Sequence, residues 1–180
     1  SGDRILCFSY NKRDKKLEDH GIAANVKPGS GPRHLVFSPN GRYAYLMNEL
    51  SGKVIVYSYS DGKLKELQSI AADNANARGG ADIHVSPDGM FVYASTRLKG
   101  DGITIFRVGN KGTLTRVGAQ LTGKHPRNFA ITPNGNFLLV ACRDDNSIQV
   151  YSRDKDTGLL KNTHQDIVLS HPVCVKFYPE

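Results

Sequence analysis

PRHLVFSPNG (residues 32–41), ADIHVSPDG (81–89) and PRNFAITPNG (126–135) are three versions of one pattern, a short apolar segment that runs into a turn with proline and glycine. A shorter fourth version, PVCVKFYPE, occupies residues 172–180. The prolines they share lie 48, 46 and 46 residues apart in the order Pro39, Pro87, Pro133 and Pro179. Self-similarity at a nearly fixed period indicates a repeat architecture.

After each of the first three turns the sequence continues with the same pattern. An aromatic-rich segment such as YAYLMNEL is followed by a turn, a further segment such as KVIVYSYS, and a weaker fourth segment such as LKELQSI. β-branched and aromatic residues are typical of strands, and these segments lack the 3.6-residue periodicity of helical repeats. Four short antiparallel strands per repeat are typical of a β-propeller blade. The sequence therefore predicts an all-β protein, a β-propeller of four-stranded antiparallel blades.

The repeat predicts a single partial propeller domain over residues 1–180. Its parts are the end of a blade over 1–31, full blades over 32–80, 81–125 and 126–171, and the first strand of a closing blade over 172–180. Such a chain presents sheet faces and strand edges that neighbouring blades would cover. We therefore expect it to self-associate, or to pair with an N-terminal half of the propeller.

Composition narrows the classes of partner. The net charge is +7, but the basic residues are scattered, and the densest run, residues 12–16, contains its own aspartate. Nucleic-acid binding would need clustered basic residues with exposed aromatics between them. The apolar runs are far shorter than the roughly 20 residues that span a bilayer. We therefore expect neither a nucleic-acid nor a membrane partner.

The cysteine and histidine spacings argue against several kinds of chemistry. Cys7, Cys142 and Cys174 form no CxxC pair, and as buried reduced thiols they favour a reducing, cytoplasmic compartment. No histidine pair has the close spacing of a metal site, and no GxSxG motif is present. We expect no metal and no cofactor, and any hydrolysis would proceed without a covalent intermediate.

Four of these segments together resemble the lactonase family of seven-bladed β-propellers. The matching text is KPGSGPRHLVFSPNGRYAYLMNEL (27–50), PDGMFVYASTR (87–97), HPRNFAITPNGNFLLVAC (125–142) and PVCVKF (172–177). GPRH followed by NEL is the specific part of this resemblance. The resemblance implies that the chain corresponds to the C-terminal half of such a propeller, without a histidine motif that the family carries in its N-terminal half.

The resemblance implies catalytic roles for Arg33, Glu49 and Arg97. The two arginines would hold anionic oxygens of a substrate, and Glu49 would act as a base or orient one. Residues at the ends of inner strands point to the mouth of a propeller channel, which agrees with these roles. The structural alternatives are a loop cap for Arg33, a bridge to Arg33 for Glu49, and a solvated strand end for Arg97.

Other polar residues near the same strand ends are candidates for substrate binding. The segment KHPRNF resembles the cleft-lining segment of the next blade, and His34 follows Arg33 directly. In a regular strand His34 would point to the face opposite Arg33. For each candidate, the alternative to substrate binding is a structural role as a packed, hydrogen-bonded side chain. The set is His34, His84, His125, Arg127 and Asn128.

The implied function is metal-independent hydrolysis of a small anionic lactone. The first expectation is hydrolysis of 6-phosphoglucono-δ-lactone to 6-phosphogluconate, a step of the pentose phosphate pathway. One alternative is a muconate-type lactonising cycloisomerase, which would use arginines in the same way. Another is a non-catalytic propeller that binds or scaffolds partners. That alternative would gain support if Arg33 and Glu49 were paired with each other and closed to solvent.

Overall fold

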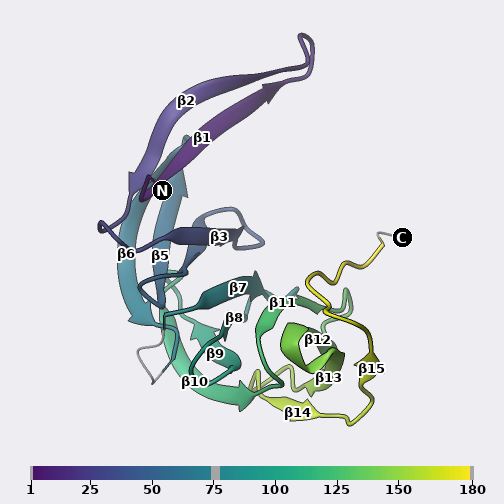
Figure 1. Cartoon of the computed structure of the whole chain (residues 1–180). Helices are drawn as coiled ribbons and strands as arrows, with labels where there is room; N and C mark the ends of the chain where they lie inside the picture. The colour runs from purple at the N-terminus through teal and green to yellow at the C-terminus, as the bar shows by residue number, and fades with distance from the viewer. Residues whose placement is uncertain (1, 74–77, 179–180) are drawn as a thin grey trace.

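The structure is a computed structural model that describes residues 2–73 and 78–178. Its described residues form antiparallel strands and one short 3₁₀ helix, η1 (Arg143–Asp145). Figure 1 shows the strands as a curved series of sheets that follow one another in chain order. The prediction of an all-β propeller fold with four-stranded antiparallel sheets is confirmed.

The sheets follow the repeat. The chain starts with the hairpin β1 (Arg4–Asn11) and β2 (Lys16–Asn25). The next sheet contains β3 (Pro32–Phe37), β4 (Tyr43–Asn48), β5 (Lys53–Ser60) and β6 (Lys63–Ala71). The second contains β7 (Gly80–Val85), β8 (Phe91–Thr96), β9 (Gly102–Val108) and β10 (Leu114–Leu121). The third contains β11 (Pro126–Ile131), β12 (Phe137–Cys142), β13 (Ser147–Arg153), β14 (Leu160–Asn162) and β15 (Ile167–Val168). Apart from Gly80, these strands lie inside the ranges predicted for the blades.

Two segments differ from the expected strands. The single fourth strand expected in the third blade is divided into β14 and β15, which both pair with β13. His164, which lies between these two strands, has a positive φ of 57°. Residues 172–178, expected as the first strand of a further blade, form no strand, since no described strand pairs with them. Residues 179–180 and 74–77 of the predicted blade ranges lie outside the described residues.

The proline-containing turns join the first and second strand of each sheet. In the first turn the Ser38 hydroxyl donates to Asn40 Oδ1 and accepts from the backbone N–H of Tyr43. Ser86 with Asp88 and Thr132 with Asn134 repeat the arrangement. The turn glycines have positive φ of 69° to 72°, which explains why glycine recurs there: Gly41, Gly89 and Gly135.

The apolar core lies between successive sheets. Alternate residues of one strand point to opposite faces, so the second strand of a sheet serves two cores. In β4, Ala44 and Leu46 pack toward β5 and the hairpin, whereas Tyr45 and Met47 pack against residues of the next sheet such as Ile83. A third cluster, which includes Tyr93 and Phe129, joins the second and third sheets. The first and second sheets are therefore held by apolar burial on both faces.

The first strands of the three sheets lie on the inner side of the curve. β7 contacts both β3 and β11, although the three strands belong to different sheets. Figure 1 shows them following one another along this inner side, with the C-terminal segment passing near β11. Residues at equivalent repeat positions on these strands are consequently neighbours in space.

A buried arginine links the second and third sheets near the turns. The Arg153 side chain is fully buried, and it donates to Tyr93 Oη at 2.8 Å, to the Gly135 carbonyl at 3.0 Å and to Asp88 Oδ2 at 2.7 Å. Asp88 also supports its own turn by accepting from the Met90 N–H. The carboxylate thus compensates a cation that burial would otherwise destabilise.

We expect Asp88→Asn to lower the free energy of unfolding by about 2 kcal/mol, because the turn acceptor remains while Arg153 loses its counter-ion. Asparagine fits this turn, since Asn40 and Asn134 occupy the same position in the other repeats. Urea unfolding measures the change, with the exposed Asp166→Asn as control. A loss below about 0.5 kcal/mol for Asp88→Asn would contradict this account.

The β1–β2 hairpin is a sheet of two strands with large apolar side chains exposed on it, among them Phe8, Tyr10 and Leu17. Exposed apolar surface and an unpaired strand edge both favour association. We expect the 180-residue chain alone to self-associate at micromolar concentration, and Phe8→Lys to weaken this association. Light scattering during size-exclusion chromatography measures the mass. A monomer at all concentrations would show that these features do not drive assembly.

Candidate active site

A β-bulge recurs near the start of each inner strand. The pairing register shifts between Pro32 and His34 in β3, and between Pro126 and Asn128 in β11. β7 shifts between Gly80 and Ile83. An inserted residue bends the strand and redirects side chains, so simple alternation fails there. β3 is therefore not regular here, and the condition under which His34 would face away from Arg33 is not met. Both residues line the cavity and bond to β7, Arg33 to the Ala81 carbonyl and His34 to Asp82.

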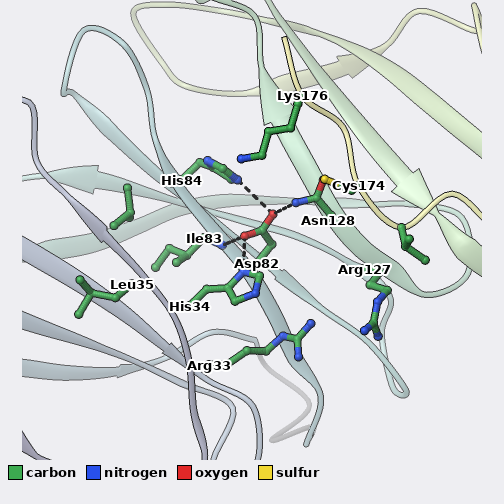
Figure 2. A pocket seen from close by; sticks show the side chains of 12 residues that line it. Arg33, His34, Leu35, Asp82, Ile83, His84, Arg127, Asn128, Cys174 and Lys176 are labelled. Atoms are coloured by element: carbon green, nitrogen blue, oxygen red, sulfur yellow. Dashed lines mark hydrogen bonds and ion pairs between the residues drawn. The ribbon is translucent and has the colours of Figure 1, made fainter. Parts of the chain in front are cut away.

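This cavity has a volume of about 650 Å³ and lies over the inner strands. Figure 2 shows three of its lining side chains, those of His34, His84 and Asn128, converging on the Asp82 carboxylate. β3 supplies Arg33 and His34 and β7 supplies Asp82 and His84. The other polar side chains are Arg127 and Asn128 of β11 and, from the C-terminal segment, Cys174 and Lys176.

The Asp82 carboxylate is buried and accepts hydrogen bonds from all three inner strands. His34 Nδ1 lies 2.7 Å from Oδ1, and His84 Nε2 lies 3.0 Å from Oδ2. Asn128 Nδ2 donates to Oδ2 at 2.5 Å, and the backbone N–H groups of Ile83 and Phe129 also donate. Burial raises the pKa of this carboxyl, but the hydrogen bonds from His34 and His84 outweigh burial and hold the pKa below its usual value. Asp82 is therefore an anion at neutral pH.

The ionised carboxylate determines which nitrogen of each imidazole donates. A carboxylate only accepts, so His34 donates from Nδ1 and His84 donates from Nε2. In the neutral rings, His34 Nε2 and His84 Nδ1 are then the acceptor nitrogens. The His84 ring is further held edge-to-face against Phe129, with 4.8 Å between ring centroids.

Glu49 lies beside the cavity and accepts from two arginines. Arg97 donates to Oε1 at 2.6 Å, and Arg33 Nη1 lies 3.4 Å from Oε2. Burial raises the pKa of Glu49, but the Arg97 hydrogen bond and the Arg33 charge outweigh it, so the pKa is lowered. The Arg33 and Glu49 side chains are 20% and 39% exposed. They are paired but not closed to solvent, so the condition for the non-catalytic alternative is met only in part.

Arg97 and His125 continue this row outside the cavity lining. The Arg97 side chain is only 6% exposed and also donates to the carbonyls of Gly79 and Gly80. Its Nη1 lies 3.1 Å from His125 Nε2, which must accept because arginine only donates. On the other side of the ring, His125 Nδ1 lies 3.2 Å from Asp144 Oδ2. Burial and the charges of Arg143 and Arg97 lower the pKa of His125, which agrees with a neutral ring.

The predicted site residues thus fall into two connected groups. The cavity contains Arg33, His34, His84, Arg127 and Asn128. The row beside the cavity contains Glu49, Arg97 and His125, and Arg33 joins the two groups through Glu49. Arg97 is a buried link in this row, so it is not the solvated strand end considered as its alternative.

Sequence reasoning missed Asp82 and Lys176. Asp82 lies five residues before its turn proline Pro87, as His34 does before Pro39 and Asn128 before Pro133. The repeat therefore contained the signal for Asp82, since equivalent positions on the inner strands meet in space. Lys176 lies three residues before Pro179, as His84 does before Pro87, so the repeat contained a signal for Lys176 as well. The C-terminal segment that carries it reaches the cavity without forming a strand, and its Val175 N–H donates to Asn128 Oδ1.

Metal binding finds no support in the described residues, where no group of three His, Cys, Asp or Glu side chains has a geometry for an ion. In residues 2–73 and 78–178, no helix is long and apolar enough to span a membrane. The three cysteines are free, but the expectation that all are buried holds for Cys142 alone, since Cys7 is half-buried and Cys174 is exposed. Burial raises the pKa of the Cys142 thiol to about 12.

Residues 2–177 match the family described as lactonase, 7-bladed beta-propeller. The chain belongs to this family. A 6-phosphogluconolactonase of Formosa agariphila is 48% identical over 153 residues, which is 82% of this chain and 43% of the relative. This lactonase-family chain spans about half the length of the curated relatives it matches.

Two solved structures of similar proteins also align over about half of their length. The first comes from Bacteroides uniformis and is provisionally named a 6-phosphogluconolactonase; it is 58% identical, with a TM-score of 0.96 over 99% of this chain and 52% of the other. The second is a periplasmic gluconolactonase of Pseudomonas aeruginosa, 31% identical, with a TM-score of 0.89 over 98% of this chain and 51% of the other. Both therefore preserve the arrangement of sheets described above.

The low pKa of Asp82 predicts acid sensitivity. Its folded-state pKa lies below the unfolded value of about 3.9, so the unfolded state binds more protons between these two values. The carboxylate therefore contributes stability above about pH 4, and this contribution is lost as the pH falls toward the folded-state value.

We expect Asp82→Asn to be less stable than the wild type at about pH 7, and the difference to shrink below about pH 4. Urea unfolding at a series of pH values measures it. A stability difference that stays constant with pH would show that the charge of Asp82 does not act through these hydrogen bonds.

Proposed function

We propose that this protein hydrolyses a phosphorylated sugar lactone, 6-phosphoglucono-δ-lactone, without a metal ion. The observation that carries the proposal is the distribution of cations in the cavity. Arg33 is held in place by Glu49 and by the Ala81 carbonyl, whereas Arg127 and Lys176 form no hydrogen bond or ion pair with any described residue. One fixed and two free cations suit a substrate with two anionic regions, a phosphate and a developing oxyanion.

Arg33 is the group best placed to stabilise the oxyanion. Its Nε donates to the Ala81 carbonyl at 3.0 Å and its Nη1 pairs with Glu49, which leaves other guanidinium N–H groups free for a ligand. A donor that is fixed before the reaction loses little energy to reorganisation when charge develops. Water attack on the lactone carbonyl would place such charge on the carbonyl oxygen.

Arg127 and Lys176 are suited to the phosphate. Arg127 is the bulged residue of β11, and its guanidinium can donate two parallel hydrogen bonds to phosphate oxygens. Lys176 reaches the same cavity from the C-terminal segment, and Figure 2 shows it beside His84, with Arg127 in another part of the lining. A phosphorylated ligand would supply an anionic partner for these two side chains, which pair with no described residue.

Glu49 is better suited to orienting arginines than to accepting a proton. Both of its oxygens face arginine donors, and its pKa is lowered, which makes it a weak base. Of the two roles considered for Glu49, this favours orientation. Arg97 in turn is a positioning residue, because it is buried against Glu49 and does not line the cavity.

The names of the relatives support this choice of reaction over lactone formation. The Formosa agariphila protein is a 6-phosphogluconolactonase, and the Pseudomonas aeruginosa protein is a gluconolactonase. Their difference makes the phosphate the feature to test. The three free cysteines agree with a reducing compartment, and we propose the cytoplasm.

The test is hydrolysis of 6-phosphoglucono-δ-lactone and of unphosphorylated glucono-δ-lactone by the purified protein, measured above the spontaneous rate. We expect turnover of the phosphorylated lactone. In Arg127→Ala, the KM for that substrate should rise about 10- to 100-fold, the value of one charged hydrogen-bonding group. The KM for the unphosphorylated lactone should change less than about twofold, because it lacks the phosphate.

The exposed turn residue Arg42 provides the matched control, since Arg42→Ala removes one positive charge from a residue that does not line the cavity. Absence of turnover by the wild type would contradict the proposed function. An equal KM change for both lactones would retain hydrolysis but remove Arg127 from phosphate binding.

A further inference from the structure

The cavity contains an aspartate–histidine pair with the geometry of a positioned proton acceptor. His34 Nδ1 donates to the ionised Asp82 at 2.7 Å, and the remaining acceptor nitrogen, Nε2, has no hydrogen-bond partner among the described residues. The His34 side chain is 41% exposed, whereas Asp82 is buried. A carboxylate that fixes one imidazole nitrogen and stabilises the positive charge on the ring is the arrangement that makes histidine an effective general base.

The position of His34 places this nitrogen near the cations of the site. Because of the bulge, His34 and the preceding Arg33 line one cavity with Arg127. In Figure 2 the His34 ring lies between the Asp82 carboxylate and the Arg33 side chain. The other titratable and charged residues that line the cavity with His34 are Arg33, Asp82, His84, Arg127, Cys174 and Lys176.

The other proton acceptors of the region are less suited to this role. Glu49 faces two arginines, and the acceptor nitrogen of His125 already receives a hydrogen bond from Arg97. His84 lies two residues beyond Asp82 along β7, at the repeat position of Val36, and its ring packs on Phe129. His34 is the only one of these groups that directly follows a cavity arginine.

We propose that His34 is the general base of lactone opening and that Asp82 is its positioning residue, an inference that rests on the proposed function. The oxygen of a water molecule bonds to the lactone carbonyl carbon while one water proton moves to His34 Nε2. The carbonyl oxygen becomes an oxyanion beside Arg33. As the carbonyl re-forms, the bond from its carbon to the ring oxygen breaks, and the Nε2 proton moves to that oxygen.

The products are then a hydroxyl and a carboxylic acid, which ionises to the solvent. One water is consumed for each lactone, and His34 ends in the neutral state in which it began. The ionised Asp82 stabilises the imidazolium that forms between the two proton transfers. No metal, cofactor or covalent intermediate enters this sequence.

His34→Ala tests the base directly. We expect kcat for 6-phosphoglucono-δ-lactone to fall about 10²- to 10⁴-fold with KM nearly unchanged, since the loss is of proton transfer and not of binding. Imidazole added to the solution should raise the rate of this variant at least about tenfold, because it can occupy the space of the missing ring. His20→Ala, on the exposed hairpin, should keep the wild-type rate and show no response to imidazole.

Asp82 is tested through a double-mutant cycle. Asp82→Asn should lower kcat about 10²-fold or more, and the His34→Ala/Asp82→Asn double variant should be no slower than His34→Ala, because Asp82 acts through His34. A merely structural role for Asp82 would add its own loss to the double variant. Circular dichroism confirms that each variant is folded.

The outcomes separate the two proposals. If the wild type does not turn over the lactone, the proposed function fails, and the role of His34 fails with it. If the wild type is active and folded His34→Ala retains kcat within about threefold, or loses it without rescue by imidazole, the function stands and His34 is not the base.

Discussion

A single buried carboxylate organises the inner side of this structure. Removing Asp82 from water is unfavourable unless its oxygens are fully hydrogen-bonded. Donors from β3, β7 and β11 meet that requirement together: His34, His84, Asn128 and the backbone of Ile83 and Phe129. The same bonds that compensate the buried charge therefore hold three strands of different sheets in one arrangement, and they fix the imidazoles that face the cavity.

The polar row beside the cavity arises from the same geometry of repeats. Glu49 and Arg97 directly follow the second strands of successive repeats and are separated by 48 residues, as are Pro39 and Pro87. Equivalent positions of neighbouring sheets are adjacent. Because one repeat has an acidic residue and the next a basic residue at this position, an ion pair forms between the two sheets. A site composed of several blades can thus arise from single substitutions in a repeated scaffold, while the apolar core between the sheets retains its pattern.

Much of this organisation could be predicted from the sequence. Local residue preferences predict the strand positions, the sheet order and the turns at Pro39, Pro87 and Pro133. The same preferences recur in each repeat, so an ambiguous segment can be assigned by comparison with the equivalent segments. The residues near the channel mouth could also be predicted as a group, because inner strands of a propeller end there. The pairing of Glu49 with Arg33, one of the alternatives that the sequence suggests, is present in the structure.

The sequence by itself determined the fold class, the repeat and the chemical character of the inner strands. Tertiary structure decided which side chains share the cavity, because the bulge between Pro32 and His34 reverses the facing that strand alternation predicts. It also decided that the acid at the centre is Asp82, since burial and hydrogen bonding depend on neighbours 46 and 48 residues away along the chain. A shift of one residue in the pairing register is enough to reverse the face to which a side chain points. The sequence pattern that predicts a strand extends over many residues, so a one-residue bulge does not hide it.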